Sequence, residues 1–152
     1  MKIIKYFFEF ITIISLFSIF KLIGLKNASN LGGILGKFFG PLFRSKHTIE
    51  QNIKIGLGEL YKKKESEIIN SMWSNIGRTF AEYVFLKDFK FNKTNFDHMK
   101  INGINYLGEI KKNNETVIFY SAHFANFELM AMELDKFGIK CAAIYRPLNN
   151  FF

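Results

Sequence analysis

A long apolar segment near the N-terminus constrains this chain more than any other feature of its sequence. Residues 3–25 read IIKYFFEFITIISLFSIFKLIGL. As a helix, a segment of this length extends over about 34 Å, which is enough to cross the apolar core of a bilayer. Lys5, Glu9 and Lys21 interrupt the segment, and the uninterrupted part, residues 10–20, is too short to span alone. We therefore expect a helix that associates with a membrane.

The polar residues of this segment share one side of the expected helix, because they recur every three or four positions. Such a stripe is typical of a helix lying in the membrane interface, or of a spanning helix whose polar side faces protein. A cleaved signal peptide would require a small-x-small site after the apolar run, and residues 21–26 offer none. We interpret residues 1–25 as a retained membrane anchor, with a signal peptide and a buried core helix as the alternatives. The stripe consists of Lys2, Lys5, Glu9, Thr12 and Ser15.

The basic excess of the chain lies beside this apolar segment. The formal net charge is +8, and residues 1–46 contain seven Lys or Arg against Glu9 alone. A basic cluster next to an apolar helix favours an anionic membrane surface over nucleic acid as the partner. Nucleic-acid binders also favour Arg, whereas this chain has far more Lys. Basic residues directly after an anchor predict that the rest of the chain lies in the cytoplasm.

The composition excludes several classes of protein. Because 49% of the residues are hydrophobic, the chain is not a disordered tail. Cys141 is the only cysteine, which excludes an intramolecular disulfide framework and a cysteine-based zinc site. The three histidines, His47, His98 and His123, share no close spacing, so we expect no histidine-rich metal site.

Helical patterns fill the middle of the chain. We expect a helix over residues 28–39, with Ser29 or Asn30 as its N-cap and a stop at Gly40-Pro41, and a second helix over residues 41–57. The clearest helix is expected over residues 62–87, because its apolar residues follow one helical face. That face consists of Ile69, Met72, Trp73, Ile76, Phe80, Tyr83 and Val84.

The pattern changes after a polar connection at residues 88–100. A helix over 103–112 is followed by a short apolar run, Thr116–Tyr120, typical of a buried strand. A helix over 125–137 ends at Gly138, and Ile139–Tyr145 reads as a second strand. Strand, helix and strand predict a βαβ unit with parallel strands. We therefore expect an α/β fold: a membrane-associated helix, a helical region, and the start of a mixed or parallel sheet.

Two parallel strands do not form a stable sheet alone, so further strands are needed. We accordingly take residues 26–152 as the N-terminal part of an incomplete domain.

The junction between the first strand and the next helix carries the residues best suited to chemistry. His123 lies at the expected strand end, and Glu128 lies five positions later, near the start of the helix. This spacing allows the carboxylate to orient the imidazole, whose other nitrogen then takes a proton from a substrate hydroxyl. Ligands of α/β sheets bind at such positions, beyond the carboxyl ends of the strands.

These residues also carry a family resemblance. Residues 121–129, SAHFANFEL, and 144–150, IYRPLNN, resemble the bacterial lipid A late (lauroyl/myristoyl) acyltransferases of the lysophospholipid acyltransferase superfamily. That family carries His-Phe-Gly-Asn-Trp-Glu, which His123, Asn126 and Glu128 match, whereas Ala125 and Phe127 replace its Gly and Trp. The resemblance extends upstream to the N-terminal segment and covers essentially the whole chain, but about the first half of a family member.

The resemblance implies a reaction, its partners and a location. An acyl chain moves from acyl carrier protein to a hydroxyl of a lipid A precursor, at the cytoplasmic side of the bacterial inner membrane. His123 would be the base, Glu128 its partner, and Arg146 would lie near phosphates of the acceptor, which Arg binds bidentately. Asn126 would orient the loop. No metal, organic cofactor or nucleic acid is implied.

Two other functions stay open. One is acylation of glycerophospholipids or of a phospholipid mannoside, whose enzymes usually carry Asn-His at the start of the motif and Asp at its end. Ala122 and Glu128 argue against that alternative. The other is a truncated membrane protein without catalytic activity.

Overall fold

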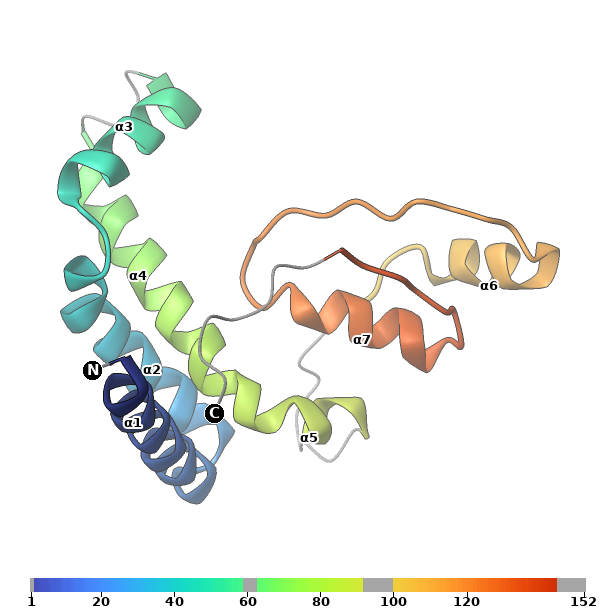
Figure 1. The fold of residues 1–152 in the computed structure, drawn as a ribbon. Coiled ribbons are helices and arrows are strands. Elements are labelled where there is room, and N and C mark those ends of the chain that lie inside the picture. Colours follow the sequence, from blue (N-terminus) through green and yellow to red (C-terminus); the bar gives the residue numbers. More distant parts are fainter. Residues whose placement is uncertain (1, 59–62, 92–99, 145–152) are drawn as a thin grey trace. The chain divides into compact units, whose positions relative to one another are not determined.

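The computed structural model describes residues 2–58, 63–91 and 100–144 (Figure 1). Within these ranges, every element of regular secondary structure is a helix. The contacts within the chain divide it into two compact units, Ile14–Val84 and Met1–Ile13 with Phe85–Phe152. In chain order the elements are α1 (Lys2–Ile23), α2 (Leu25–Phe39), η1 (Gly40–Leu42), α3 (Lys46–Leu57), α4 (Glu65–Glu82), η3 (Tyr83–Phe85), α5 (Leu86–Lys90), α6 (Ile104–Asn113) and α7 (Glu128–Lys136).

The helix predicted over the N-terminal apolar segment is confirmed as α1. Among the described residues, it is the one helix whose length and composition would allow it to cross a membrane. Most of its apolar side chains are exposed, and Phe20 is the one buried residue that it contributes. The helix ends at Gly24, whose φ of 78° is a conformation that glycine adopts without strain.

Polar side chains of α1 find partners within the same helix. Lys5 Nζ lies 3.6 Å from Glu9 Oε1, one helical turn away. The Thr12 hydroxyl donates to the Phe8 carbonyl at 2.8 Å, and Ser18 makes the same bond to the carbonyl four residues before it. A helix in an apolar environment must satisfy its polar groups internally, and α1 does so at these positions.

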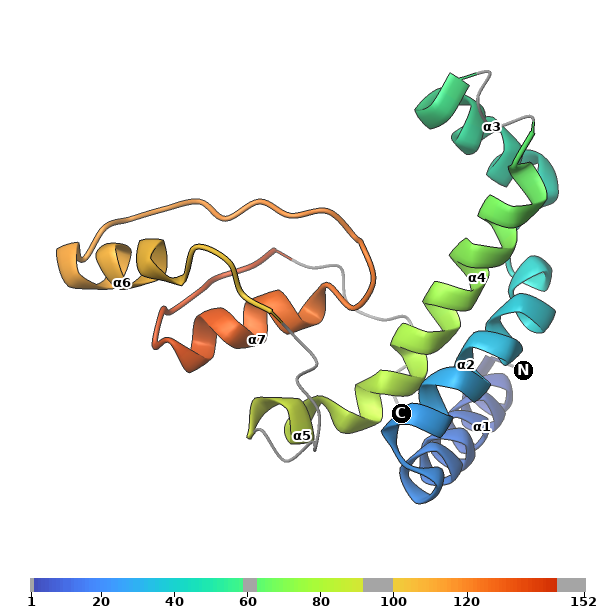
Figure 2. The same ribbon diagram turned by 180° about the vertical axis from the view of Figure 1, so that it is seen from behind.

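A stripe of small residues joins α2 to α4 in the unit Ile14–Val84. Ala28, Gly32 and Gly36 recur every four residues on one face of α2, and Gly40 continues this stripe into η1. The two helices run side by side in both views (Figures 1 and 2). A Cβ atom on Gly32 would lie 2.7 Å from the Cβ of Ala81, closer than such atoms approach in real proteins. Small residues therefore allow the two backbones to touch.

Aromatic side chains close the rest of this unit. The rings of Phe17 in α1 and Phe80 in α4 lie 5.2 Å apart, within the range of favourable aromatic pairs. Trp73 of α4 is buried, and its indole lies directly over Gly40. The C-terminal half of α1 therefore belongs to the same core as α2 and α4.

A polar cluster bridges the N-terminal half of α2 and the C-terminal half of α4. Ser29 Oγ donates to Glu82 Oε1 at 2.8 Å, and Arg78 Nη1 donates to Asn30 Oδ1 at 2.9 Å and to Ser29 Oγ at 3.3 Å. The prediction that Ser29 or Asn30 caps the helix is wrong, because α2 already begins at Leu25. Both side chains instead form hydrogen bonds with side chains of α4.

Local turn chemistry shifts the boundaries of the next two helices. The helix predicted over 41–57 begins at Lys46, because Gly40–Leu42 form a 3₁₀ turn and Ser45 provides the N-cap by accepting from the Thr48 amide at 3.2 Å. The helix predicted over 62–87 is present as α4, followed by η3 and α5. Ile76, placed on its apolar face by the sequence, is half exposed.

In the unit that contains residues 85–152, α5 packs against α7. Phe89 of α5 and Leu134 of α7 are both buried. Beside them, Lys90 Nζ lies 2.6 Å from Asp135 Oδ2. Since both charged side chains are exposed, this ion pair contributes little to stability, and burial of the two apolar side chains holds the helices together.

Helices α6 and α7 end in the same way. Asn114, with φ of 53°, and Gly138, with φ of 76°, follow the last helical residues in the left-handed conformation. After α7, the amide of Ile139 donates to the Leu134 carbonyl at 3.0 Å, which completes a Schellman cap. Lys111 Nζ also donates to the Phe137 carbonyl at 3.0 Å. The predicted stops at Asn113-Asn114 and Gly138 are confirmed.

The predicted βαβ unit and its sheet are wrong. Residues 116–120 and the described part of the second strand, 139–144, are extended, and no backbone hydrogen bond joins them in the described chain. Most of their side chains are exposed, as for Ile118, Tyr120 and Ile144, whereas Ile139 is half-buried. A strand is stabilised by its neighbours, since its own backbone groups bond to another strand. An apolar run indicates that a strand would need neighbouring strands to pair with. The described residues around these two segments provide no such strand.

Candidate active site

The segment from Ser121 to Glu128 leads from the extended chain into α7. His123 is the central residue of a tight turn, in which the Phe124 amide donates to the Ala122 carbonyl at 2.8 Å. This turn carries the imidazole outward, and His123 is exposed. A residue held at a turn with an accessible side chain is well placed to meet a substrate.

Ala125 adopts an unusual backbone conformation for a residue with a side chain. Its φ is 46°, in the left-handed region, where a Cβ atom costs roughly 1–2 kcal/mol. The motif that this segment resembles has glycine at the same position. A left-handed position favours glycine, and Ala125 adopts this conformation at a steric cost.

Glu128 is the first residue of α7 and lies in its first turn. A carboxylate at this position interacts favourably with the positive end of the helix dipole. Its side chain is half-buried, in contrast to the exposed His123. The helix predicted over 125–137 begins here, three residues later than expected, because Ala125 has left-handed geometry.

The imidazole of His123 packs against an aromatic ring. The ring centroids of His123 and Phe127 lie 4.2 Å apart, with an angle of 52° between the ring planes. Within the described part of the chain, no hydrogen bond joins His123 to Glu128, and the pairing of these two side chains stays a prediction. Phe127 is the site residue that sequence reasoning missed, although its aromatic character and its position four residues after His123 were visible.

Of the other two predicted site residues, the structure describes Asn126 but not Arg146. Asn126 is half-buried with its side-chain oxygen enclosed, and its carbonyl accepts from the Leu129 amide at 3.2 Å, at the start of α7. Asn126 thus lies between His123 and Glu128 in the connection that holds both. Arg146 lies outside the described residues. In the ranges that the structure covers, no group of three His, Cys, Asp or Glu side chains has the geometry of a metal site.

A family model described as bacterial lipid A biosynthesis acyltransferase matches residues 1–152. No curated protein and no solved structure matches the chain. The family match therefore covers the N-terminal helix, the α2–α4 pair and the His123–Glu128 segment together.

Proposed function

Because this chain belongs to the bacterial lipid A biosynthesis acyltransferase family, we propose that it transfers a fatty acyl chain from acyl carrier protein to a hydroxyl group of a lipid A precursor. In this reaction the hydroxyl oxygen attacks the thioester carbonyl. A new ester bond forms, the carbon–sulfur bond breaks, and the carrier leaves as a thiol. The observation that carries the proposal is the family match over the whole chain, which includes the histidine turn before α7.

His123 is proposed as the general base. Its imidazole is exposed on a tight turn, where it can accept the proton of the acceptor hydroxyl and later give it to the leaving sulfur. The contact with Phe127 limits the orientations of the ring. A base held in this way needs less reorganisation when the substrate binds.

Glu128 is proposed as the partner that stabilises the protonated imidazole. Its position at the start of α7 is five residues from His123, across a connection that includes Asn126. Catalytic hydrogen bonds are often long or absent in a free enzyme and tighten in the substrate complex. We expect the Glu128 carboxylate to accept from His123 once the acceptor is bound.

Asn126 and Arg146 are proposed to bind or position the substrate. Asn126, whose side-chain oxygen is enclosed, would hold the loop in shape beside the acceptor. Arg146 would bind a phosphate of the lipid A precursor, because a guanidinium pairs with phosphate through two parallel hydrogen bonds.

The N-terminal helix is proposed to anchor the chain in the bacterial inner membrane, with residues 1–25 as the anchor and residues 26–152 as part of the acyltransferase domain on the cytoplasmic side. Its exposed apolar side chains and internally bonded polar groups support contact with lipid. The basic residues that follow support the cytoplasmic orientation.

The test is an acyl-transfer assay with the membrane-bound protein, acyl carrier protein that carries a radiolabelled acyl chain, and a lipid A precursor. His123→Ala should reduce the rate by about 10²–10⁴-fold, as expected for loss of a general base. His47→Ala is the matched control, because His47 is also exposed but lies in α3. Equal rates for the two variants would refute the role of His123. Transfer to glycerol 3-phosphate in place of the lipid A precursor would refute the proposed acceptor.

A further inference from the structure

The outward face of α2 carries large apolar side chains that stay largely exposed in the described part of its unit. Ile34, Phe38 and Leu42 recur every four residues along a helical backbone that continues through the 3₁₀ turn. Their exposed fractions are 63%, 74% and 80%. Phe43 follows and is also exposed. These four residues are called the outer apolar face.

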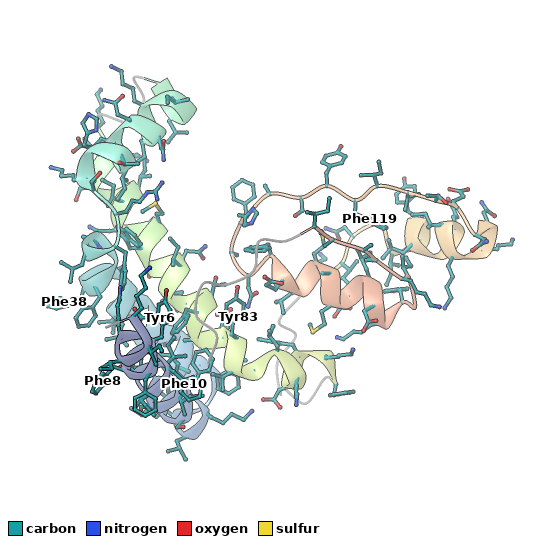
Figure 3. All side chains as sticks on the ribbon, viewed as in Figure 1. Tyr6, Phe8, Phe10, Phe38, Tyr83 and Phe119 are labelled. Atoms are coloured by element: carbon teal, nitrogen blue, oxygen red, sulfur yellow. The ribbon has the colours of Figure 1, made fainter. Side chains whose placement is uncertain are left out.

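This face points away from the helix pair. Ile34 and Phe38 each lie two positions beyond a member of the small-residue stripe, Gly32 and Gly36. Two positions correspond to about 200° around a helix. Since the stripe contacts α4, the outer apolar face lies on the opposite side, and Figure 3 shows Phe38 projecting from α2 away from α4.

Basic residues accompany the outer apolar face, and acidic residues are absent from this part of the sequence. Lys26, Lys37 and Arg44 are all exposed. Between Glu9 and Glu50 the chain contains no Asp or Glu. A helix with large apolar residues on one side and only cations beside them is typical of an element that lies on an anionic bilayer.

The connection to α1 brings this face close to the membrane anchor. Gly24 is the one residue between the end of α1 at Ile23 and the start of α2 at Leu25. The chain therefore enters α2 at the level where the apolar helix ends. If that end reaches the bilayer surface, α2 begins at the headgroups.

We propose that the outer apolar face is a second membrane-contact surface, which binds anionic lipid beside the α1 anchor. Its apolar side chains enter the boundary between headgroups and acyl chains, and Lys37 and Arg44 contact lipid phosphates. The proposal rests on the membrane location given under the proposed function and adds a surface to it. A protein partner would be the less suitable occupant, because a face with cations alone would require a correspondingly acidic partner.

The experiment measures how deeply single side chains lie in the bilayer. In the full chain, Cys141→Ser removes the free exposed cysteine. Phe38→Cys and Leu42→Cys are each labelled with a nitroxide in vesicles of phosphatidylethanolamine and phosphatidylglycerol. Collision with oxygen, which concentrates in lipid, is compared with collision with a polar nickel chelate, which stays in water. Phe8→Cys in α1 is the lipid reference, and Asn70→Cys on the exposed side of α4 is the control.

We expect the ratio of oxygen to nickel accessibility at Phe38→Cys and Leu42→Cys to exceed that at Asn70→Cys several-fold. Lys37→Glu with Arg44→Glu, or vesicles of phosphatidylcholine, should move both labels toward water. Labels as accessible to nickel as Asn70→Cys would overturn the proposal. So would labels inaccessible to both reagents, since protein would then cover the face. If Phe8→Cys also contacts water, membrane association itself fails, whereas the acyl-transfer assay tests catalysis separately.

Discussion

Gly36 of α2 and Gly77 of α4 lie in backbone contact: a Cβ atom added to Gly36 would be 3.0 Å from the Cα of Gly77. The carbonyl of Trp73 would be closer still. Neither obstacle is a flexible side chain, so the helices would have to separate to accept a methyl group.

Gly36→Ala is therefore expected to lower the free energy of unfolding by about 1–3 kcal/mol, as other overpacked sites do. Gly56→Ala is the matched control, since Gly56 lies in α3 with open space around its Cα. That change should stabilise the protein by up to about 1 kcal/mol through helix propensity. Chemical unfolding in detergent micelles, followed by circular dichroism, measures both. Stabilisation by Gly36→Ala would contradict the observed helix contact.

Arg78→Ala is expected to weaken the link between α2 and α4. The guanidinium donates to Asn30 Oδ1 and to Ser29 Oγ, and each such bond contributes about 0.5–1.5 kcal/mol net. A double-mutant cycle with Asn30→Ala isolates one of the bonds. A coupling energy of zero in that cycle would show that Arg78 and Asn30 do not interact in solution.

Ala125→Gly is expected to stabilise the turn before α7. Glycine accepts the φ of 46° without the steric cost that alanine bears, and the net gain is up to about 1 kcal/mol. Ala122→Gly in the same segment is the control, because Ala122 does not have a positive φ and should lose a few tenths of a kcal/mol. Thermal unfolding compares the two. If both variants lose stability equally, the left-handed conformation of Ala125 is wrong.

Phe127→Ala is expected to slow acyl transfer about tenfold through loss of the ring that orients His123, while the protein stays folded. Phe127→Trp should restore most of the rate, because a larger ring supplies the same contact. An intact rate in Phe127→Ala would show that the contact has no part in catalysis. The pH dependence of the rate is the second readout, since a change in the imidazole environment shifts its profile, whereas a loss of folded protein does not.

The helices were predictable because their signals are local. Trp73 and Phe80 recur at helical spacing, and Gly138 stops α7 through its own backbone freedom. Helix starts were less predictable: Ser29 has the chemistry of an N-cap, yet it binds Glu82 from inside α2. Such a long-range contact leaves no trace in the local sequence.

The absence of strands from the described residues was not predictable for the same reason. Thr116–Tyr120 has the composition of a buried strand, but burial and pairing depend on neighbours that a single segment does not contain. Only the position of the candidate site in the chain was predictable, and its internal contacts were not. Its position before α7 followed from the change of pattern at His123, whereas the ring contact with Phe127 and the left-handed φ of Ala125 between them left no signal in the sequence.

The four-residue recurrence of the glycines in α2 also restricts how this helix is able to move. Sliding α2 along α4 by one residue would place Leu35 or Lys37 where Gly36 now touches backbone. Rotation of α2 about its axis would likewise bring a larger side chain against the backbone of α4. A shift of α2 by four residues would again place a small residue at this contact. The glycines thus fix the rotation of α2 about its own axis. They thereby determine which side chains of α2 face away from α4.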